Sequence, residues 1–308
     1  MMDSYHFFKE DFMRQLSIFD ITVEREKTEP TSQENWVLID GDNLLNRAFH
    51  ATSHNIKLSP DGRPTNGVSH FLTMLLNFKS KYNATPLVFF DKGKGFRKIL
   101  YPDYKEGRSE KPAMLIPQFP LIREVLSAGG IPYFWDDELE ADDLIASACQ
   151  TLNGHKYIIS NDKDLLQLVR DDVTVVARKS KDDVEITPSK FREMYEGLLP
   201  VQITDLKAIA GDNSDNIKGV KGVGDTGAMK FVKHYGNVEE IAKATEFPSE
   251  FSRYAKKMAA GIDDMLFAKK LTTLVDNKSI QFNHYEVNKD GLSAICETLA
   301  MRSIIYLL

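Results

Sequence analysis

Cysteines, long apolar runs and nucleophile signatures are scarce in this sequence. Its 308 residues include two cysteines, Cys149 and Cys296. Each lies in an apolar pattern of helical spacing, where cysteine packs as a small hydrophobic residue, so we expect neither a zinc site nor a disulfide framework. No apolar run reaches the ~20 residues of a transmembrane helix. The N-terminus lacks the basic start and apolar run of a secretory signal. These absences predict a reduced, cytoplasmic protein without a membrane partner.

The sequence also lacks a Ser-His-Asp or Cys-His signature, so nothing in it points to a covalent nucleophile. With 42% hydrophobic and 27% charged residues, the composition is typical of globular proteins. The length suffices for one large domain or two modest ones. The net charge of −6 is unusual for a protein that binds nucleic acid. Local basic patches, however, decide such binding more than the sum does.

The most conspicuous feature present is an acidic cluster, Glu140-Ala141-Asp142-Asp143, between an extended run and a helical pattern. Glu140 and Asp143 are three residues apart, so a helix places them on one face, and Asp142 points toward a neighbouring strand. Two like charges ~4 Å apart repel by about 4 kcal/mol at an effective dielectric of 20. A helix N-terminus offsets part of this cost. A divalent cation such as Mg²⁺ or Mn²⁺ would also offset it, and the motif alone leaves both interpretations open.

Acidic residues recur where other apolar runs end. Residues 36–39 precede Asp40, and residues 86–90 precede Asp91, with helical patterns between them. The run at 157–160 leads into Asn161-Asp162-Lys163-Asp164, and a further strand is expected at 173–177. This alternation predicts a parallel α/β sheet, in which sites gather beyond the carboxyl ends of the strands. A single aspartate there is usually a turn or cap residue, whereas several indicate one shared site.

The stretch after Asp91 is basic and contains interleaved aromatic residues. Basic groups can bind phosphates, and aromatic faces can stack on unpaired bases, although a solvated surface loop can have the same composition. Its place directly after a candidate metal ligand favours nucleic-acid binding. The residues concerned are Lys92, Lys94, Phe96, Arg97, Lys98, Tyr101, Tyr104, Lys105, Arg108 and Lys111.

From about Pro188 the pattern is helical, with one interruption that begins at Gly211. A glycine-rich segment follows, with Gly219, Gly222 and Gly224 and flanking lysines such as Lys221. Glycines at this spacing resemble a helix–hairpin–helix loop, whose backbone N–H groups approach a DNA phosphate or a monovalent cation. A plain turn between two helices is the alternative.

The first 35 residues are expected to form a flexible extension, because most of residues 22–35 are too polar to build a core. Within it, Gln15-Leu16-Ser17-Ile18-Phe19 resembles the short peptide by which bacterial replication proteins bind the β sliding clamp. Leu16 and Phe19 would enter an apolar groove, and Gln15 would supply hydrogen bonds. The apolar residues of this extension also fall near helical spacing, so an amphipathic helix docked on the core is the alternative.

Taken together, these motifs resemble the 5′ nuclease family of flap endonucleases and 5′–3′ exonucleases. The layout is similar to the free-standing bacteriophage enzymes and to the nuclease domain of bacterial DNA polymerase I. The resemblance runs from about Trp36 to the C-terminus and leaves out the N-terminal extension. It rests on ordered motifs, which are Ile39-Asp40-Gly41-Asp42-Asn43, Phe90-Asp91-Lys92-Gly93-Lys94, Phe96-Arg97 with Tyr104-Lys105 and Arg108, Glu140-Ala141-Asp142-Asp143, Asn161-Asp162-Lys163-Asp164, Gly211-Asp212 through Asp215-Asn216, and the glycine-rich hairpin.

The resemblance implies an α/β fold, with a PIN-like parallel-sheet nuclease core, a helical arch and a helix–three-turn–helix. The expected domains are the extension at 1–35, the nuclease core at 36–187 with its arch at 92–130, and a helical DNA-binding region at 188–308 with its hairpin at 216–234. The implied activity is metal-dependent hydrolysis of phosphodiesters at 5′ junctions between single- and double-stranded DNA in replication or repair, with RNA primers among the substrates.

The resemblance also implies roles for individual residues. Two Mg²⁺ or Mn²⁺ ions are implied, and K⁺ at the hairpin. The acids that match those around the first metal are Asp40, Asp91, Glu140, Asp142 and Asp143. Those that match the second are Asp162, Asp164, Asp212 and Asp215. The catalytic matches are Lys105 and Arg108, which contact the scissile phosphate, and Tyr104, a stacking position. The expected DNA-binding residues are Arg97, Lys98, Gly219, Lys221, Gly222 and Gly224.

The implied partners are DNA with 5′ junctions, RNA primer–DNA hybrids and a bacterial-type sliding clamp, in the cytoplasm of a bacterial or phage-infected cell. Two other functions stay open. A catalytically inactive flap-DNA-binding scaffold would be expected to have lost some site acids, and all nine are present here. A PIN-like ribonuclease would need neither the hairpin nor so long a chain.

Overall fold

The structure is a computed structural model that describes residues 34–93, 95–280 and 285–307. The residues expected to bind a sliding clamp, Gln15, Leu16 and Phe19, lie outside these ranges, so their role stays a prediction. Among the helices of the described ranges, none is long and apolar enough to cross a membrane.

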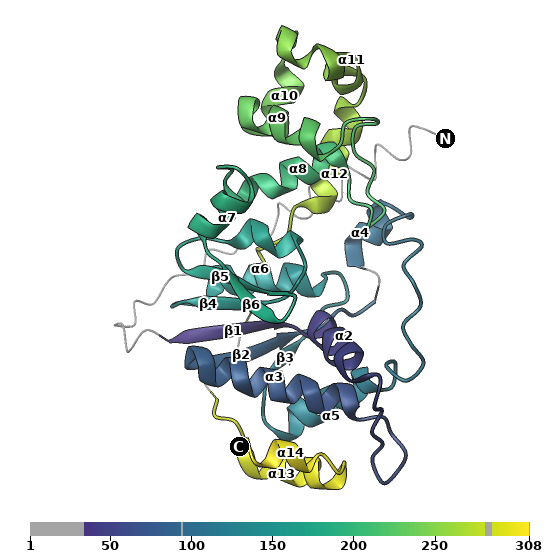
Figure 1. Ribbon diagram of the computed structural model, residues 1–308, viewed down its shortest axis with the longest axis vertical. Coiled ribbons are helices and arrows are strands. Elements are labelled where there is room, and N and C mark those ends of the chain that lie inside the picture. Colours follow the sequence, from purple (N-terminus) through teal and green to yellow (C-terminus); the bar gives the residue numbers. More distant parts are fainter. Residues whose placement is uncertain (1–33, 94, 281–284, 308) are drawn as a thin grey trace. The chain divides into compact units, whose positions relative to one another are not determined.

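A six-stranded sheet in the order β3-β2-β1-β4-β5-β6 lies at the centre of the described chain (Figure 1). Five strands are parallel, and β6 is antiparallel to β5 at one edge. The predicted α/β class with a mostly parallel sheet is therefore confirmed. The strands are β1 (Asn35–Asp40), β2 (Ala84–Phe89), β3 (Tyr133–Phe134), β4 (Lys156–Ile159), β5 (Val173–Lys179) and β6 (Asp182–Ile186).

Side-chain alternation along β1 explains why its apolar run has no polar interruption. Val37 and Ile39 pack into one hydrophobic cluster, and Trp36 and Leu38 pack into another. Successive side chains of a strand point to opposite faces of the sheet. A central parallel strand is covered by helices on both faces, so every position along it is apolar.

Helices cover both faces of this sheet (Figure 1). Three of them, α2, α3 and α5, share a cluster with Val37 and Ile39, whereas α6 and the 3-10 helix η1 pack with Trp36 and Leu38. The helices that follow β1 and β4 begin near the edge where those strands end. The bounds are α2 (Gly41–Thr52), α3 (Asn66–Tyr82), α5 (Gln118–Ala128), α6 (Ala141–Thr151) and η1 (Asp164–Leu168).

The sixth strand was not predicted from the sequence. The chain reverses through Ser180, which has a φ of 58°, and β6 then pairs with β5 from Asp182 to Ile186. In β6 only Ile186 is buried, so the segment has no apolar run that would indicate a strand. Charged side chains on an edge strand also protect it from pairing with other chains.

The arch was predicted to span residues 92–130, and the structure places part of this range in the core. The segment begins with the short helix α4 (Gly95–Leu100), and residues 101–117 form turns. The next helix, α5, buries Leu121 and Val125 in the core beside α3. This part of the chain is therefore a crossover helix between β2 and β3 and not an arch. We call residues 101–117 the arch segment below.

A helical region follows the sheet, as predicted. The glycine-rich segment 211–224 joins α8 to α9, and α10 and α12 pack against this pair. The elements are α7 (Pro188–Met194), η2 (Pro200–Gln202), α8 (Ile203–Ala210), α9 (Asp225–Tyr235), α10 (Val238–Lys243), η3 (Ser249–Phe251), α11 (Ser252–Ala260) and α12 (Ile262–Thr272).

The last two helices were assigned to the DNA-binding region, and the structure places them elsewhere. They pack against α5 and α3, on the other face of the sheet from α6. A Cβ atom on Gly291 would lie 2.2 Å from the carbonyl oxygen of Ala128, so glycine permits the close approach to the end of α5. A helical pattern shows that a helix has an apolar face but not which element covers it. The bounds are α13 (Lys289–Thr298) and α14 (Arg302–Ile305).

Arg97 was predicted to bind DNA, but it lies in the interior, where its side chain is 2% exposed. Its Nη1 and Nη2 atoms donate to the two carboxylate oxygens of Asp143 at 2.6 and 2.7 Å. Its Nε donates to the carbonyl of Leu271 at 2.8 Å. Arg97 therefore joins α4 to α6 and to the end of α12, and it cannot reach a phosphate in this position.

Breaking this pair should be costly, because the remaining partner would be a buried charge without compensation. We expect Arg97→Met to lower the free energy of unfolding by about 3–5 kcal/mol, measured by urea unfolding. Lys92→Met is the control, since Lys92 forms an exposed ion pair with Asp137 and its loss should cost less than ~1 kcal/mol. Small and equal effects of both substitutions would contradict the role given to Arg97.

Candidate active site

Four aspartates from different elements come together at the carboxyl edge of the parallel sheet. Asp40 ends β1, Asp91 follows β2, and Asp162 follows β4. β1 pairs in register with both β2 and β4, so these three strand ends are neighbours. Asp142 joins them from the first turn of α6.

Hydrogen bonds hold two of these carboxylates in place, those of Asp40 and Asp91. Asp40 accepts from the backbone N–H of Asn43 at 3.0 Å and from the hydroxyl of Ser160 at 2.8 Å. The same hydroxyl accepts from the backbone N–H of Asp162 at 3.0 Å. Asp91 accepts from the backbone N–H at the start of α6 at 2.8 Å. The ends of β1, β2 and β4 are thus linked through polar contacts to one another or to α6.

Asp40 and Asp142 lie close enough to the other carboxylates for those charges to oppose their ionisation. Burial raises the pKa of Asp40 to about 7, and the charges of Asp91 and Asp162 add to this rise. Burial also raises the pKa of Asp142 well above its ordinary value, and the charges of Asp162, Asp40 and Asp91 act in the same direction. A site with these properties stabilises a bound cation.

A second acidic group lies where η1 approaches α8. Burial raises the pKa of Asp164 to about 6, against the opposing effect of Lys207. The ammonium of Lys207 bonds to Asp164 and lies 2.6 Å from an oxygen of Asp212. Although burial acts in the opposite direction, hydrogen bonds from Lys207 and Ser214 lower the pKa of Asp212 to about 2. One cationic side chain therefore bridges two predicted metal ligands.

The arch segment is tied to two further acids. The hydroxyl of Tyr104 lies 2.9 Å from carboxylate oxygens of both Glu140 and Asp215. The ammonium of Lys105 lies 2.5 Å from Glu140, and the guanidinium of Arg108 lies 2.5 Å from Asp215. The structure thus brings Lys105 and Arg108 to the acidic site, and their catalytic role stays a prediction.

Besides Arg97, three of the predicted site residues make contacts that do not suit the predicted roles. Asp143 is fully buried, and both its oxygens accept hydrogen bonds from Arg97, so neither is free for a metal ion. Tyr104 is 4% exposed, so its ring is not available for stacking on a base. Lys98 is half-buried and donates to the carbonyl of Tyr104 at 3.0 Å.

Three residues of the site were not predicted from the sequence. Asp42 accepts from the backbone N–H of Asp91 at 3.1 Å and from Lys111 at 2.9 Å. Asp42 and Ser160 both lie near the end of a strand, which is a signal that could have found them. Lys207 lies inside α8, and no sequence pattern marks it as a partner of the acids.

The segment between α8 and α9 packs closely against itself. Gly211 has a φ of 84°, which favours glycine. A Cβ atom on Gly219 would lie 2.3 Å from the backbone nitrogen of Gly211, so this position also requires glycine. Gly222 has a φ of 79°, and its carbonyl accepts from the ammonium of Lys257 at 3.1 Å. Lys221, Gly222 and Gly224 are exposed, which leaves a lysine and backbone groups available to a ligand.

No three acidic, histidine or cysteine side chains of the described ranges lie close enough together to hold one metal ion. Several of the carboxylates pair with lysine or arginine instead. The donors nevertheless suit Mg²⁺ or Mn²⁺, because both ions prefer oxygen ligands and Mg²⁺ keeps several waters between itself and the protein. Beyond the effect of burial, the charges of neighbouring aspartates raise the pKa values of Asp40 and Asp142, which is a further sign that this edge of the sheet favours positive charge.

A cavity of about 730 Å³ opens beside the second acidic group. Asp162, Lys207 and Asp212 line it on one side. Its size is within the range of ligand pockets and suffices for a nucleotide-sized group. Its apolar side chains are Met194, Ile203, Leu206, Ala210 and Met229.

Two family models together match most of the chain. The model for the 5′-3′ exonuclease N-terminal resolvase-like domain matches residues 35–196. The model for the 5′-3′ exonuclease C-terminal SAM fold matches residues 198–293. The boundary between the two models falls after α7, near the start of the helical region.

The chain has relatives at more than 30% identity. It is 35% identical to DNA polymerase I of Bacillus subtilis (strain 168) over 288 residues, which are 89% of this chain and 32% of that protein. It is 31% identical to the 5′-3′ exonuclease of Mycoplasma pneumoniae over 286 residues, which are 89% of this chain and 94% of that protein. The chain thus spans about a third of the length of the DNA polymerase I relative and nearly all of the free-standing exonuclease.

A solved structure of bacteriophage T5 D15 flap endonuclease, a pseudo-enzyme-product complex with DNA and metal ions, has a similar fold. The TM-score is 0.65 at 23% identity, and the match covers 89% of this chain and 99% of that one. At this identity the likeness concerns the fold. The family models and the relatives carry the assignment further: this chain belongs to the 5′–3′ exonuclease family.

Proposed function

We propose that this chain is a metal-dependent 5′ nuclease that hydrolyses phosphodiesters where single-stranded and double-stranded DNA meet. The observation that carries the proposal is the convergence of Asp40, Asp91, Asp142 and Asp162 at one sheet edge, beside the cationic Lys105. Membership of the 5′–3′ exonuclease family supports this reaction class. The T5 flap endonuclease, which shares the fold, supports the choice of DNA junctions as the substrate.

Two divalent ions, Mg²⁺ or Mn²⁺, would be held by carboxylates that face this edge. When bound, such ions supply an activated water and stabilise charge on the phosphate. We leave Asp143 out of the ligand set because Arg97 holds both of its oxygens. The proposed ligands are Asp40, Asp91, Glu140 and Asp142 for one ion, and Asp162, Asp164, Asp212 and Asp215 for the other, some through water.

Lys105 and Arg108 would contact the phosphate at the cut. Both extend from the arch segment to the acids, so a phosphate placed at the carboxylates would lie beside them. A cation positioned in advance stabilises negative charge that develops in the transition state. Lys105 is held in position by its backbone N–H, which donates to the carbonyl of Asp215 at 2.9 Å.

Substrate binding would require an exchange of partners at the site. Lys105, Arg108 and Lys207 pair with acids that we assign to the metal ions. These side chains would lose their partners if the carboxylates held metal ions. Each would then be a cation without a partner, next to the place where a phosphate would bind.

The exposed Lys221, Gly222 and Gly224 of the hairpin would bind the duplex backbone, because backbone N–H groups and a lysine suit phosphate. K⁺ at this hairpin and RNA primers as substrates remain parts of the proposal that rest on the family resemblance. Binding of a sliding clamp through Gln15, Leu16 and Phe19 is proposed from the sequence motif alone. A cytoplasmic location is proposed from the composition.

The test of the nuclease proposal is cleavage of a 5′-labelled flap duplex with Mg²⁺. We expect the wild type to cut at the junction. Asp142→Asn should lower the single-turnover rate by about 10²-fold or more, because it removes a negative ligand from a site that stabilises charge in the transition state. Asp263→Asn is the control, since Asp263 is exposed on α12, and its rate should match the wild type.

Tight flap binding by the wild type without any cutting would reject the enzyme and favour the scaffold. Preferential cutting of single-stranded RNA, with no response to the flap, would favour the PIN-like ribonuclease.

The metal-free protein should lose stability as the pH rises through the range set by the raised pKa values. The pKa of Asp40 is about 7 and that of Asp164 about 6 in the folded chain, both above the value of ~3.9 for an unfolded aspartate. The folded chain therefore binds these protons more tightly than the unfolded chain does. Their contribution to stability is present at low pH and is lost between about pH 4 and pH 7.

Thermal unfolding in EDTA across this pH range measures the effect. Added Mg²⁺ should restore stability at pH 7.5 and have little effect at pH 5, because metal ligands must be deprotonated. A gain from Mg²⁺ that does not change with pH would contradict the assignment of these carboxylates.

Lys207 should stabilise the metal-free site and become less important when metal is bound. We expect Lys207→Met to lower the melting temperature in EDTA by several degrees, since it leaves Asp164 and Asp212 without a positive partner. Mg²⁺ should then raise the melting temperature of this variant more than that of the wild type. Lys269→Met is a matched control that breaks an ion pair with Asp205, which is not among the proposed metal ligands. The decrease in melting temperature of this variant should not depend on Mg²⁺.

A further inference from the structure

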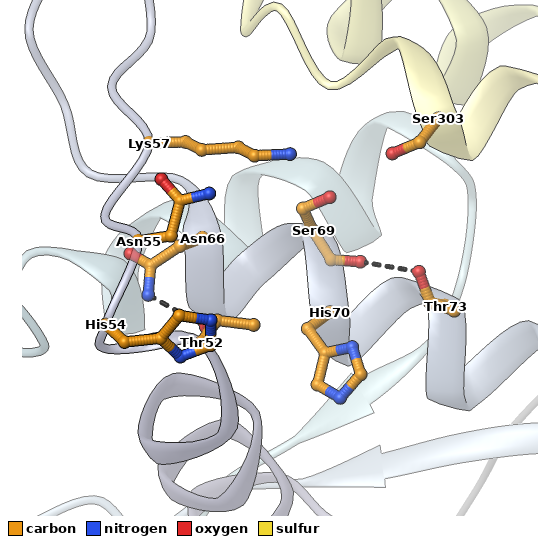
Figure 2. A pocket seen from close by; sticks show the side chains of 9 residues that line it. All are labelled: Thr52, His54, Asn55, Lys57, Asn66, Ser69, His70, Thr73 and Ser303. Atoms are coloured by element: carbon orange, nitrogen blue, oxygen red, sulfur yellow. Dashed lines mark hydrogen bonds between the residues drawn. The ribbon is translucent and has the colours of Figure 1, made fainter.

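A second cavity, of about 250 Å³, lies between the end of α2, the start of α3 and α14 (Figure 2). It is separate from the acidic site, because α2 has 12 residues and so spans about 18 Å between Asp40 and the cavity. Every side chain that lines it is polar, and none is a carboxylate. The lining residues are Thr52, His54, Asn55, Lys57, Asn66, Ser69, His70, Thr73 and Ser303.

Part of this lining is fixed by hydrogen bonds. The hydroxyl of Thr52 donates to the carbonyl of Ala48 at 2.8 Å and accepts from the amide of Asn66 at 2.9 Å. The hydroxyl of Thr73 donates to the carbonyl of Ser69 at 3.0 Å, within α3. Of these contacts, the one between Thr52 and Asn66 joins α2 to α3 at the wall of the cavity.

The remaining lining side chains have no hydrogen-bond or ion-pair partner within the described part of the chain. Each carries an N–H or O–H group that can donate to a ligand. Figure 2 shows Lys57 extended over the cavity in the direction of Ser69 and Ser303. The free side chains are His54, Asn55, Lys57, Ser69, His70 and Ser303.

Positive charge continues behind the cavity. The side chains of Arg47 and Arg178 are near enough to His70 to lower its pKa, in addition to the effect of burial. A single acid, Asp183, lies between these two guanidinium groups, at 3.6 and 3.3 Å. The Nη1 atom of Arg47 is buried without a hydrogen-bond partner. The cavity therefore combines unpaired donors with an excess of positive charge.

We propose that this cavity binds a phosphate group. The ammonium of Lys57 would supply the opposite charge, and the hydroxyls of Ser69 and Ser303 and the amide of Asn55 would donate hydrogen bonds. The volume admits a phosphate with its attached sugar, and the absence of carboxylates removes the repulsion that would keep an anion out.

Two sources of the phosphate are consistent with this chemistry. One is the backbone of a bound nucleic acid, since about 18 Å corresponds to roughly five nucleotides at 3.4 Å per step. This source rests on the proposed nuclease function. The other is a free phosphate ion, which does not depend on that function.

Binding can be measured on the metal-free full chain from the imidazole signals of His54 and His70 in NMR spectra during a titration with inorganic phosphate at constant ionic strength. We expect both signals to shift and saturate. Ser303→Glu places a carboxylate in the cavity and should weaken phosphate binding about tenfold, whereas Ser303→Gln should keep it. The absence of a saturable shift in the wild type, or equal shifts in Ser303→Glu and Ser303→Gln, would overturn the proposal.

The source is identified by the salt dependence of binding to a flap duplex, with Asp142→Asn in the background to prevent cutting. Lys57→Gln should reduce the slope of log affinity against log salt by about 0.9 if the cavity holds a backbone phosphate. Lys79→Gln, an exposed change near the opposite end of α3, should leave the slope unchanged.

An unchanged slope for Lys57→Gln, with the NMR shift retained, assigns the site to free phosphate. Without a saturable NMR shift the cavity is rejected as a phosphate site, whatever the slope and even if the protein cuts flaps. The titration requires neither metal nor cleavage, so a protein that binds phosphate and cuts no DNA would reject the nuclease proposal alone.

Discussion

Repulsion among carboxylates at one edge of the sheet is the constraint on which the rest of the structure depends. The parallel register of β1, β2 and β4 brings Asp40, Asp91 and Asp162 together, and α6 adds Asp142. Separating them would require breaking the sheet, so their charges are compensated by side chains from other segments. The arch segment, α4 and α8 each contribute a cation that contacts a neighbouring acid. Elements distant in sequence are thus held at the sheet edge by charge.

The ion pairs around the site are of two kinds, and burial distinguishes them. Arg97 and Asp143 are 2% and 0% exposed, and with the carbonyl of Leu271 they fix α4 against α6 and α12. Lys105 and Glu140 are 24% and 14% exposed, so water, a metal ion or a phosphate can reach them. The first kind cannot dissociate without unfolding, because buried charges would be left unpaired. The second can exchange partners while the fold around it stays intact.

The sequence was sufficient for the parallel strands of the sheet and for the acids at their ends, for a physical reason. An apolar run followed by an acid indicates that a strand is buried on both faces and that its end is polar. Residues 36–40 and 86–91 both have this pattern. The strand-end acids Asp40, Asp91 and Asp162 were found in this way. Family resemblance supplied the residues whose positions depend on tertiary structure, such as Asp212 and Asp215.

The remaining differences between the predictions and the structure share one cause, which is that local patterns do not identify the partner of a side chain. Arg97 and Lys105 lie in the same basic stretch, but one is buried against Asp143 and the other reaches Glu140 at the edge of the site. Asp143 and Asp142 are adjacent in sequence and point to different environments. The apolar pattern of α13 could not show that α5 covers it. Lys207 could not be identified for the same reason, because its partners Asp164 and Asp212 lie in other segments of the chain.

Helix α2 joins the two places at which we propose phosphates to bind. A Cβ atom on Gly41 would lie 2.5 Å from the ring of Phe90 and 2.9 Å from the carbonyl of Phe89, so glycine lets α2 start directly against the end of β2. Asp40 caps this end of the helix through the backbone N–H of Asn43. The other end carries Thr52, which lines the second cavity. Since one face of α2 packs in the core through Leu44, Leu45 and Ala48, the fold fixes the distance between the acids and the second cavity. A nucleic acid held at both places would therefore have its phosphates positioned by the protein rather than by its own sequence.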